Sequence, residues 1–166
     1  FVALNALDQK PIATARDAWR ASPGRMEQFK ESAGVAGRRI ALFVSRLEAD
    51  NGLDLLIRAA QALKDSRPEL TVIIIGKGPA QQDLERLAGE LGVADRVRFL
   101  GAIYDEEQLA PWFLAADMFV YPRNIGLSLL HAFGYGVPVI TDDNIATQNP
   151  EIEALRDGDN GLLYKA

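Results

Sequence analysis

The pattern of hydrophobic and polar positions divides the chain at residue 39. Residues 1–38 are polar and irregular, with prolines and glycines as interruptions, and short helices are expected at 14–21 and 25–32. From residue 39 onward, short apolar runs alternate with segments whose apolar residues recur every three or four positions. We therefore expect residues 1–38 to form an interdomain linker or connecting arm and residues 39–166 to form one folded domain.

The short apolar runs predict the strands of one sheet. They lie at 40–44, 70–75, 97–100, 118–121 and 137–141, with a sixth at 162–164. They lack the two-residue alternation of half-exposed strands, which fits strands that are buried on both faces. Helices are expected between them at 53–63, 80–91, 105–115 and 126–133, and the first carries an apolar face of Leu53, Leu56, Ile57, Ala60 and Leu63. This alternation predicts an α/β fold, a Rossmann-like doubly wound parallel sheet of about six strands.

Composition excludes several classes of protein. The formal net charge of -5 argues against a nucleic-acid-binding module, which usually carries a basic stripe. The densest apolar segment, 70–76, is too short to cross a bilayer. The chain has no cysteine, so disulfides and thiolate metal sites are excluded, and a cytoplasmic location is expected.

In an open parallel sheet, ligands bind beyond the carboxyl ends of the strands, so the loops there hold the candidate site. The turn at 76–79 reads Gly-Lys-Gly-Pro and precedes a helix whose free amides favour an anion. A tight turn without a ligand explains the same spacing equally well, and the segment is not a Walker A loop. The adjacent carboxylates Asp142 and Asp143 are more typical of a turn than of a cation site, so no metal is expected.

Two arginines and the single histidine are the other candidates. Arg123 precedes a helix expected to begin near Ile125 or Gly126, where its charge opposes the helix dipole unless an anionic ligand is present. Arg46 ends the first strand, with a salt bridge to a nearby acid as the alternative role. His131 is either a buried structural histidine or a ligand-binding one.

The motifs along residues 43–164 together resemble the C-terminal domain of the retaining, GT-B-fold glycosyltransferases of the group 1 class, family 4. The residues that carry the resemblance are Phe43–Leu47 with Gly52–Leu56, Ile75–Pro79, Val97–Gly101, Ala116-Asp117 with Tyr121-Pro122, Gly134–Ile140 and Asn160–Leu163, preceded by Asn5–Asp8 at the expected interdomain crossing. The resemblance implies that the chain is one half of a GT-B fold, in which an N-terminal acceptor domain supplies the other half of the cleft.

The resemblance also implies a UDP- or GDP-sugar donor and no metal cofactor. Arg46 matches the arginine that grips the diphosphate in this family, whereas the accompanying lysine falls at Asn51. Two glutamates that usually bind the sugar and the ribose fall at Arg123 and His131. Arginine only donates hydrogen bonds and neutral histidine offers one acceptor, so the usual contacts change. One hypothesis is that Arg123 supplies the charge that is lost at position 51.

The implied site has two sets of residues. Its catalytic set is Arg46, Arg123 and His131. Its donor-binding set is Ser45, Asn51, Gly76, Lys77, Gly78, Ile103, Tyr104, Asn124, Ile125, Gly126 and Leu127, with the base expected beside Ala102, Ile103 and Tyr104.

These residues favour an enzyme that transfers a sugar during polysaccharide or glycan assembly, located in the cytoplasm or at the inner face of the membrane, with any peripheral membrane contact made by the other half. The alternatives are a sugar-nucleotide epimerase and a degenerate domain that binds a nucleotide or a protein without catalysis. This chain is not expected to be active without the other half of the cleft.

Overall fold

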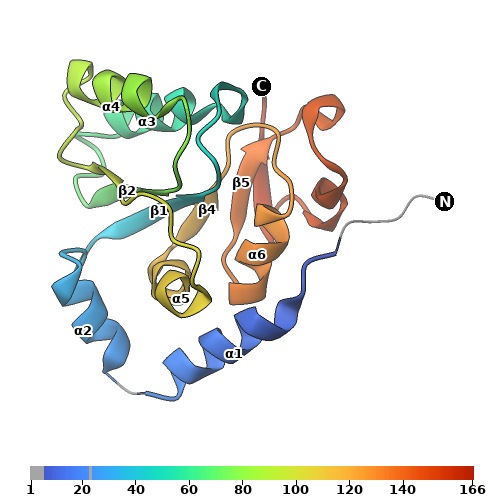
Figure 1. The fold of residues 1–166 in the computed structure, drawn as a ribbon. Helices are drawn as coiled ribbons and strands as arrows, with labels where there is room; N and C mark the ends of the chain where they lie inside the picture. The colour runs from blue at the N-terminus through green and yellow to red at the C-terminus, as the bar shows by residue number, and fades with distance from the viewer. Residues whose placement is uncertain (1–5, 23) are drawn as a thin grey trace.

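Six strands form one parallel sheet, as the apolar runs predict (Figure 1). The computed structural model describes residues 6–22 and 24–166. The strands are β1 (Arg39–Val44), β2 (Leu70–Ile75), β3 (Val97–Phe99), β4 (Met118–Val120), β5 (Val139–Asp142) and β6 (Gly161–Tyr164). Their order is β3-β2-β1-β4-β5-β6, and every neighbouring pair is parallel. This is the Rossmann order, whose direction reverses between β1 and β4, so the expected fold class is confirmed.

Helices cover both faces of the sheet. They are α1 (Gln9–Arg20), α2 (Arg25–Ser32), α3 (Leu53–Ala62), α4 (Gln81–Glu90), α5 (Glu106–Ala115) and α6 (Ser128–Tyr135), with 3₁₀ turns at Ala49–Asn51, Ile145–Thr147 and Pro150–Ala154. Figure 1 shows α3 and α4 on one face and α5 and α6 on the other. Because parallel crossovers are right-handed, reversing the direction of strand addition after β3 moves the later helices to the opposite face.

The central strands form the core. In β1 the side chains of residues 40–43 are at most 2% exposed, and in β2 those of residues 72–75 are at most 1% exposed. The predicted apolar face of α3 is buried from Leu53 to Ala60, but Leu63 is 40% exposed. The helix ends at Ala62, so Leu63 is the C-cap residue and forms the exposed end of this apolar face.

The start of α6 also differs from the expectation. The helix begins at Ser128, two residues after the predicted position 126. Ile125 is fully buried, and its amide donates to Gln148 Oε1 at 2.7 Å. Asn124 has a left-handed backbone with φ of 62°. These two features hold residues 124 and 125 outside the helix.

The N-terminal segment packs against the domain. The helix α1 begins at Gln9, earlier than the predicted residue 14, and buries Ile12 and Ala15 against the core. Pro111 in α5 has no amide hydrogen, which leaves the Glu107 carbonyl free, and Trp19 Nε1 donates to that carbonyl at 3.3 Å. The boundary at residue 39 and the role of this segment as an interdomain arm stay predictions, and Asn5 of the crossing motif lies outside the described residues.

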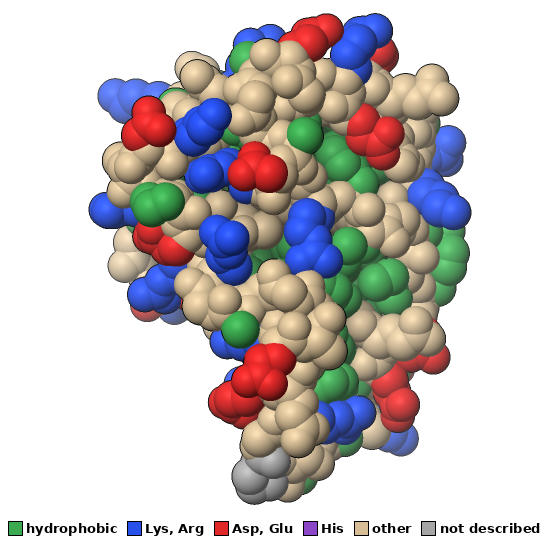
Figure 2. Space-filling model, turned by 90° about the vertical axis from the view of Figure 1, so that its left-hand side faces the viewer, with side chains coloured by type: hydrophobic (Ala, Val, Ile, Leu, Met, Phe, Trp, Pro, Cys, Tyr) green, Lys and Arg blue, Asp and Glu red, His purple; other side chains and the backbone are tan. Residues whose placement is uncertain are grey.

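Surface charges of both signs are interspersed. Figure 2 shows one face, on which Lys and Arg side chains lie among Asp and Glu side chains. Among the described residues, no helix has the length and apolar character that a membrane crossing requires.

Candidate functional site

A cavity of about 700 Å³ lies at the carboxyl end of the sheet, a volume within the usual range for small-molecule sites. The loops after β1, β2 and β3 line it, together with the first turn of α6. Eight of the predicted site residues lie on its wall, namely Ser45, Arg46, Gly76, Lys77, Gly78, Ile103, Tyr104 and His131. The strand-end rule therefore brings these residues together as predicted.

The two glycines of the turn after β2 are needed for backbone packing. A Cβ on Gly76 would overlap the Ser45 carbonyl oxygen and lie 2.9 Å from its carbon, and the backbone φ of Gly76 is 149°. A Cβ on Gly78 would lie 2.7 Å from the backbone nitrogen of Leu47. The loops after β1 and β2 are thus in direct backbone contact, and Leu47 N donates to Lys77 O at 3.1 Å. The glycines shape the cavity by allowing this contact.

The cavity wall is cationic, although the chain as a whole carries a formal charge of -5. Arg46 and Lys77 contribute the positive charges, and no Asp or Glu is among the described residues that line it. Arg46 Nε lies 2.6 Å from Glu48 Oε1, and the arginine side chain is 75% exposed. Because an exposed ion pair of this kind contributes little free energy, a phosphate group can compete for the guanidinium.

A polar network links the loops that follow β1 and β4, the two strands between which the direction of the sheet order reverses. The Tyr121 hydroxyl donates to Ser45 Oγ at 3.2 Å and accepts from Asn51 Nδ2 at 2.8 Å. Burial, and more weakly the charge of Asp50, raise the pKa of Tyr121. Asn51 is 5% exposed and also accepts from the Glu48 amide at 2.8 Å. Asn51 therefore braces the loop after β1 and does not line the cavity.

The loop between β4 and α6 contributes none of its predicted residues to the cavity wall. Arg123 is exposed, and its side-chain carbons lie beside Gly52, 3.2 Å from where a Cβ would stand there. Asn124 donates to Asp50 at 3.1 Å, and Asn149 donates to Asn124 Oδ1 at 3.0 Å. These contacts hold the loop between the segment that contains Asp50 and Gly52 and the segment that contains Asn149.

Further along this loop, the backbone amides differ in their availability. The Ile125 amide is already bonded to Gln148. The amides of Gly126 and Leu127 make no hydrogen bond to a described residue. Those two remain available donors at the start of α6.

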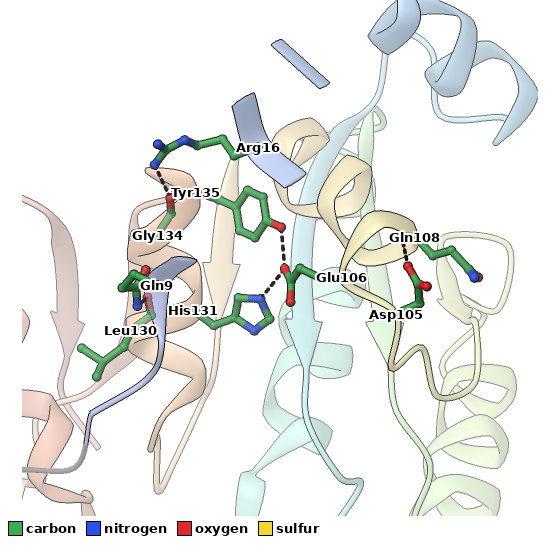
Figure 3. Close-up of polar contacts among 9 residues, drawn as sticks. All are labelled: Gln9, Arg16, Asp105, Glu106, Gln108, Leu130, His131, Gly134 and Tyr135. Atoms are coloured by element: carbon green, nitrogen blue, oxygen red, sulfur yellow. Dashed lines mark hydrogen bonds and ion pairs between the residues drawn. The ribbon is translucent and has the colours of Figure 1, made fainter. Parts of the chain in front are cut away.

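His131 enters the cavity wall from α6 and carries a carboxylate partner (Figure 3). Its Nε2 lies 2.9 Å from Glu106 Oε1, an atom that also accepts from the Tyr135 hydroxyl. The imidazole packs on the Phe113 ring with centroids 4.6 Å apart. Burial first, and then the hydrogen bond to Glu106, raise the pKa of Tyr135.

Sequence reasoning missed several residues of the site. Ser128 lines the cavity, and its hydroxyl donates to the Val44 carbonyl at 3.1 Å, tying α6 to β1. Glu106, the first residue of α5, was not among the predicted site residues. Its pairing with His131 spans 25 residues, and no local pattern reveals it. Within residues 6–22 and 24–166, no three His, Cys, Asp or Glu side chains form a group that could hold a metal ion.

Solved structures share this fold. The structure of Anabaena HepE in complex with UDP and glucose aligns with a TM-score of 0.73 at 25% identity, covering 87% of this chain and 39% of that one. The C-terminal domain of the group 1 glycosyl transferase LpcC from Francisella tularensis aligns with a TM-score of 0.69 at 25% identity, covering 87% of this chain and 75% of that one. The chain thus has the Rossmann-like domain of a GT-B glycosyltransferase.

The family model described as Glycosyl transferases group 1 matches residues 25–166, so the chain belongs to this family. The GDP-mannose-dependent alpha-(1-6)-phosphatidylinositol monomannoside mannosyltransferase of Mycolicibacterium smegmatis is 32% identical over 145 residues, covering 81% of this chain and 38% of that protein. The D-inositol 3-phosphate glycosyltransferase of Streptomyces coelicolor is 38% identical over 136 residues, covering 75% of this chain and 29% of that protein. The chain therefore spans well under half the length of these relatives.

Proposed function

We propose that the chain is the donor-binding domain of a retaining glycosyltransferase that uses a UDP- or GDP-sugar in polysaccharide or glycan biosynthesis. The observation that carries the proposal is the cavity at the carboxyl ends of β1, β2 and β3, with Arg46 and Lys77 on its wall. Membership of the group 1 family and the similarity to Anabaena HepE, solved with UDP and glucose, support it.

The charges of the cavity suit a diphosphate. The guanidinium of Arg46 can form two parallel hydrogen bonds to a phosphate, and the ammonium of Lys77 adds a second positive charge. When the bond between the sugar and the diphosphate breaks, negative charge accumulates on the departing nucleoside diphosphate, and cations already in place stabilise that charge. Arg46 and Lys77 are assigned this role, and no metal ion is required for it. Ile103 and the exposed Tyr104 form the wall assigned to the base.

A second domain completes the proposed enzyme. The matched relatives are more than twice as long as this chain, and the acceptor is assigned to the N-terminal domain of such a protein. This chain is expected to bind the donor but not to transfer its sugar alone. The enzyme is proposed to act in the cytoplasm.

Titration calorimetry of UDP, GDP, UDP-glucose and GDP-mannose into this chain tests the proposal. We expect one nucleotide series to bind, and Arg46→Ala to weaken it by about 10- to 100-fold, the usual effect of losing a charged hydrogen bond. The control is Arg86→Ala, because Arg86 is an exposed arginine of α4 paired with Asp83 and Glu90. Addition of EDTA is expected to leave affinity unchanged. The absence of binding to all four nucleotides would overturn the proposal, as would equal affinity of the two variants.

A further inference from the structure

The single histidine of the chain lies in a defined hydrogen-bonding arrangement. His131 lines the cavity, and its Nε2 lies 2.9 Å from Oε1 of Glu106 (Figure 3). Glu106 is the first residue of α5, where the helix dipole favours a negative charge. The side chains of His131 and Glu106 are only 18% and 26% exposed. The pair is therefore a partly buried contact between two helices and not a mobile surface pair.

The position of one proton follows from this geometry. An ionised carboxylate only accepts hydrogen bonds, so the nitrogen facing it must carry hydrogen. The Tyr135 hydroxyl also points at Oε1 of Glu106, and it donates as well, since burial and the neighbouring carboxylate raise its pKa. Oε1 thus accepts two hydrogen bonds, and His131 contributes one of them from Nε2. The Nδ1 atom makes no hydrogen bond to a described residue.

We propose that Glu106 is a positioning residue, which holds the proton of His131 on Nε2 so that Nδ1 serves as a hydrogen-bond acceptor for a hydroxyl group of the bound nucleotide sugar. Sugar and ribose hydroxyls are donors that need an acceptor, and a neutral imidazole has only one to offer. Without Glu106 the ring is free to turn and to exchange tautomers, and that acceptor is lost from the cavity wall. The ligand part of this proposal rests on the proposed function.

The ring proton can be observed without any ligand. With one histidine in the chain, nitrogen-15 NMR of the side chain gives one pair of ring-nitrogen signals. At pH 8 we expect a protonated Nε2, whose hydrogen exchanges slowly with water, and an unprotonated Nδ1. In Glu106→Ala the protection of that hydrogen should disappear, whereas Glu107→Gln, on the exposed neighbouring residue, should retain it. A proton on Nδ1 in the wild-type chain would overturn the proposal.

A double-mutant cycle measures the same coupling through affinity. Glu106→Ala and His131→Ala are each expected to weaken binding of UDP or GDP by about 2- to 10-fold, the effect of one hydrogen bond. The double variant should bind no more weakly than His131→Ala, because Glu106 acts only through the ring. Additive losses with equal melting temperatures would refute the positioning role. If the wild-type chain binds no nucleotide, the proposed function fails, while the NMR result still decides where Glu106 holds the proton.

Discussion

Replacement of Gly76 by alanine should lower the free energy of unfolding of the domain itself, in addition to any effect on ligand binding. The new Cβ would overlap the Ser45 carbonyl oxygen and lie 2.9 Å from its carbon, whereas real Cβ atoms essentially never come closer than 3.0 Å to such atoms. The collision is with backbone, so no side chain can rotate away. The loop after β1 would have to move, together with the hydrogen bond from Ser45 N to Ile75 O at 3.1 Å.

Two costs add in this variant. Overpacking at a tight contact costs about 1–3 kcal/mol. A side chain at the φ of 149° found at Gly76 adds backbone strain, for which about 1–3 kcal/mol is typical. The free energy of unfolding should therefore fall by about 2–6 kcal/mol, out of a total of about 5–15 kcal/mol for a typical protein. The melting temperature should fall by at least about 4 °C for a chain of this size.

Gly89→Ala is the matched control for this variant. Gly89 lies within α4, and an added Cβ there meets nothing within 4 Å. The same chemical change should therefore raise stability by about 0.5–1 kcal/mol, because alanine favours the helix. Urea denaturation of both variants, followed by circular dichroism, gives the two free energies. If Gly76→Ala unfolds within 1 kcal/mol of the wild type, the close contact between the two loops is refuted.

Further predictions concern alkaline pH and the charge at position 51. Burial is the main cause that raises the pKa of Tyr121, Tyr135 and Tyr164 above 10.0, so their contribution to stability is complete below pH 10 and is lost as pH rises through their folded values. Urea denaturation at increasing pH should show this decline, reduced in Tyr135→Phe; an identical decline would contradict it. If Arg123 replaces the charge missing at Asn51, Asn51→Lys should restore UDP or GDP binding to Arg123→Ala in calorimetry, and no recovery would reject the hypothesis.

The fold could be predicted because each buried parallel strand appears in the sequence as a short, mostly apolar run. The run 70–75 matches β2 residue for residue, since both faces of that strand are covered and every position except Thr71 is apolar. Helix ends were less accurate, because long-range contacts decide them. Gln148 holds the amide of Ile125, and this contact across 23 residues delays the start of α6. One contact of α1, from Trp19 to a carbonyl freed by Pro111, joins residues 88 positions apart, and the sequence of residues 1–38 alone does not show it.

The site could be predicted as far as strand topology determines it. Residues immediately after β1, β2 and β3 reach the cavity because parallel strands end at one edge. The direction of a side chain within a longer loop is not fixed in that way. Asn51 was expected at the donor, yet its amide group is held by Tyr121, 70 positions later. Arg123 was expected in the same catalytic set as Arg46, but its side chain lies beside Gly52, outside the cavity wall.

The two positions at which the family resemblance would place glutamates have different surroundings in the structure. At position 131 the carboxylate is replaced by an imidazole, and Glu106 supplies a carboxylate to that imidazole from a neighbouring helix. Under the proposal above, Nδ1 of that imidazole is the acceptor that remains for the nucleotide sugar. At position 123 the exposed arginine has no such partner among the described residues and does not line the cavity. Donor binding in this chain should therefore depend on His131 through its contact with Glu106, while substitution at Arg123 should act mainly through charge.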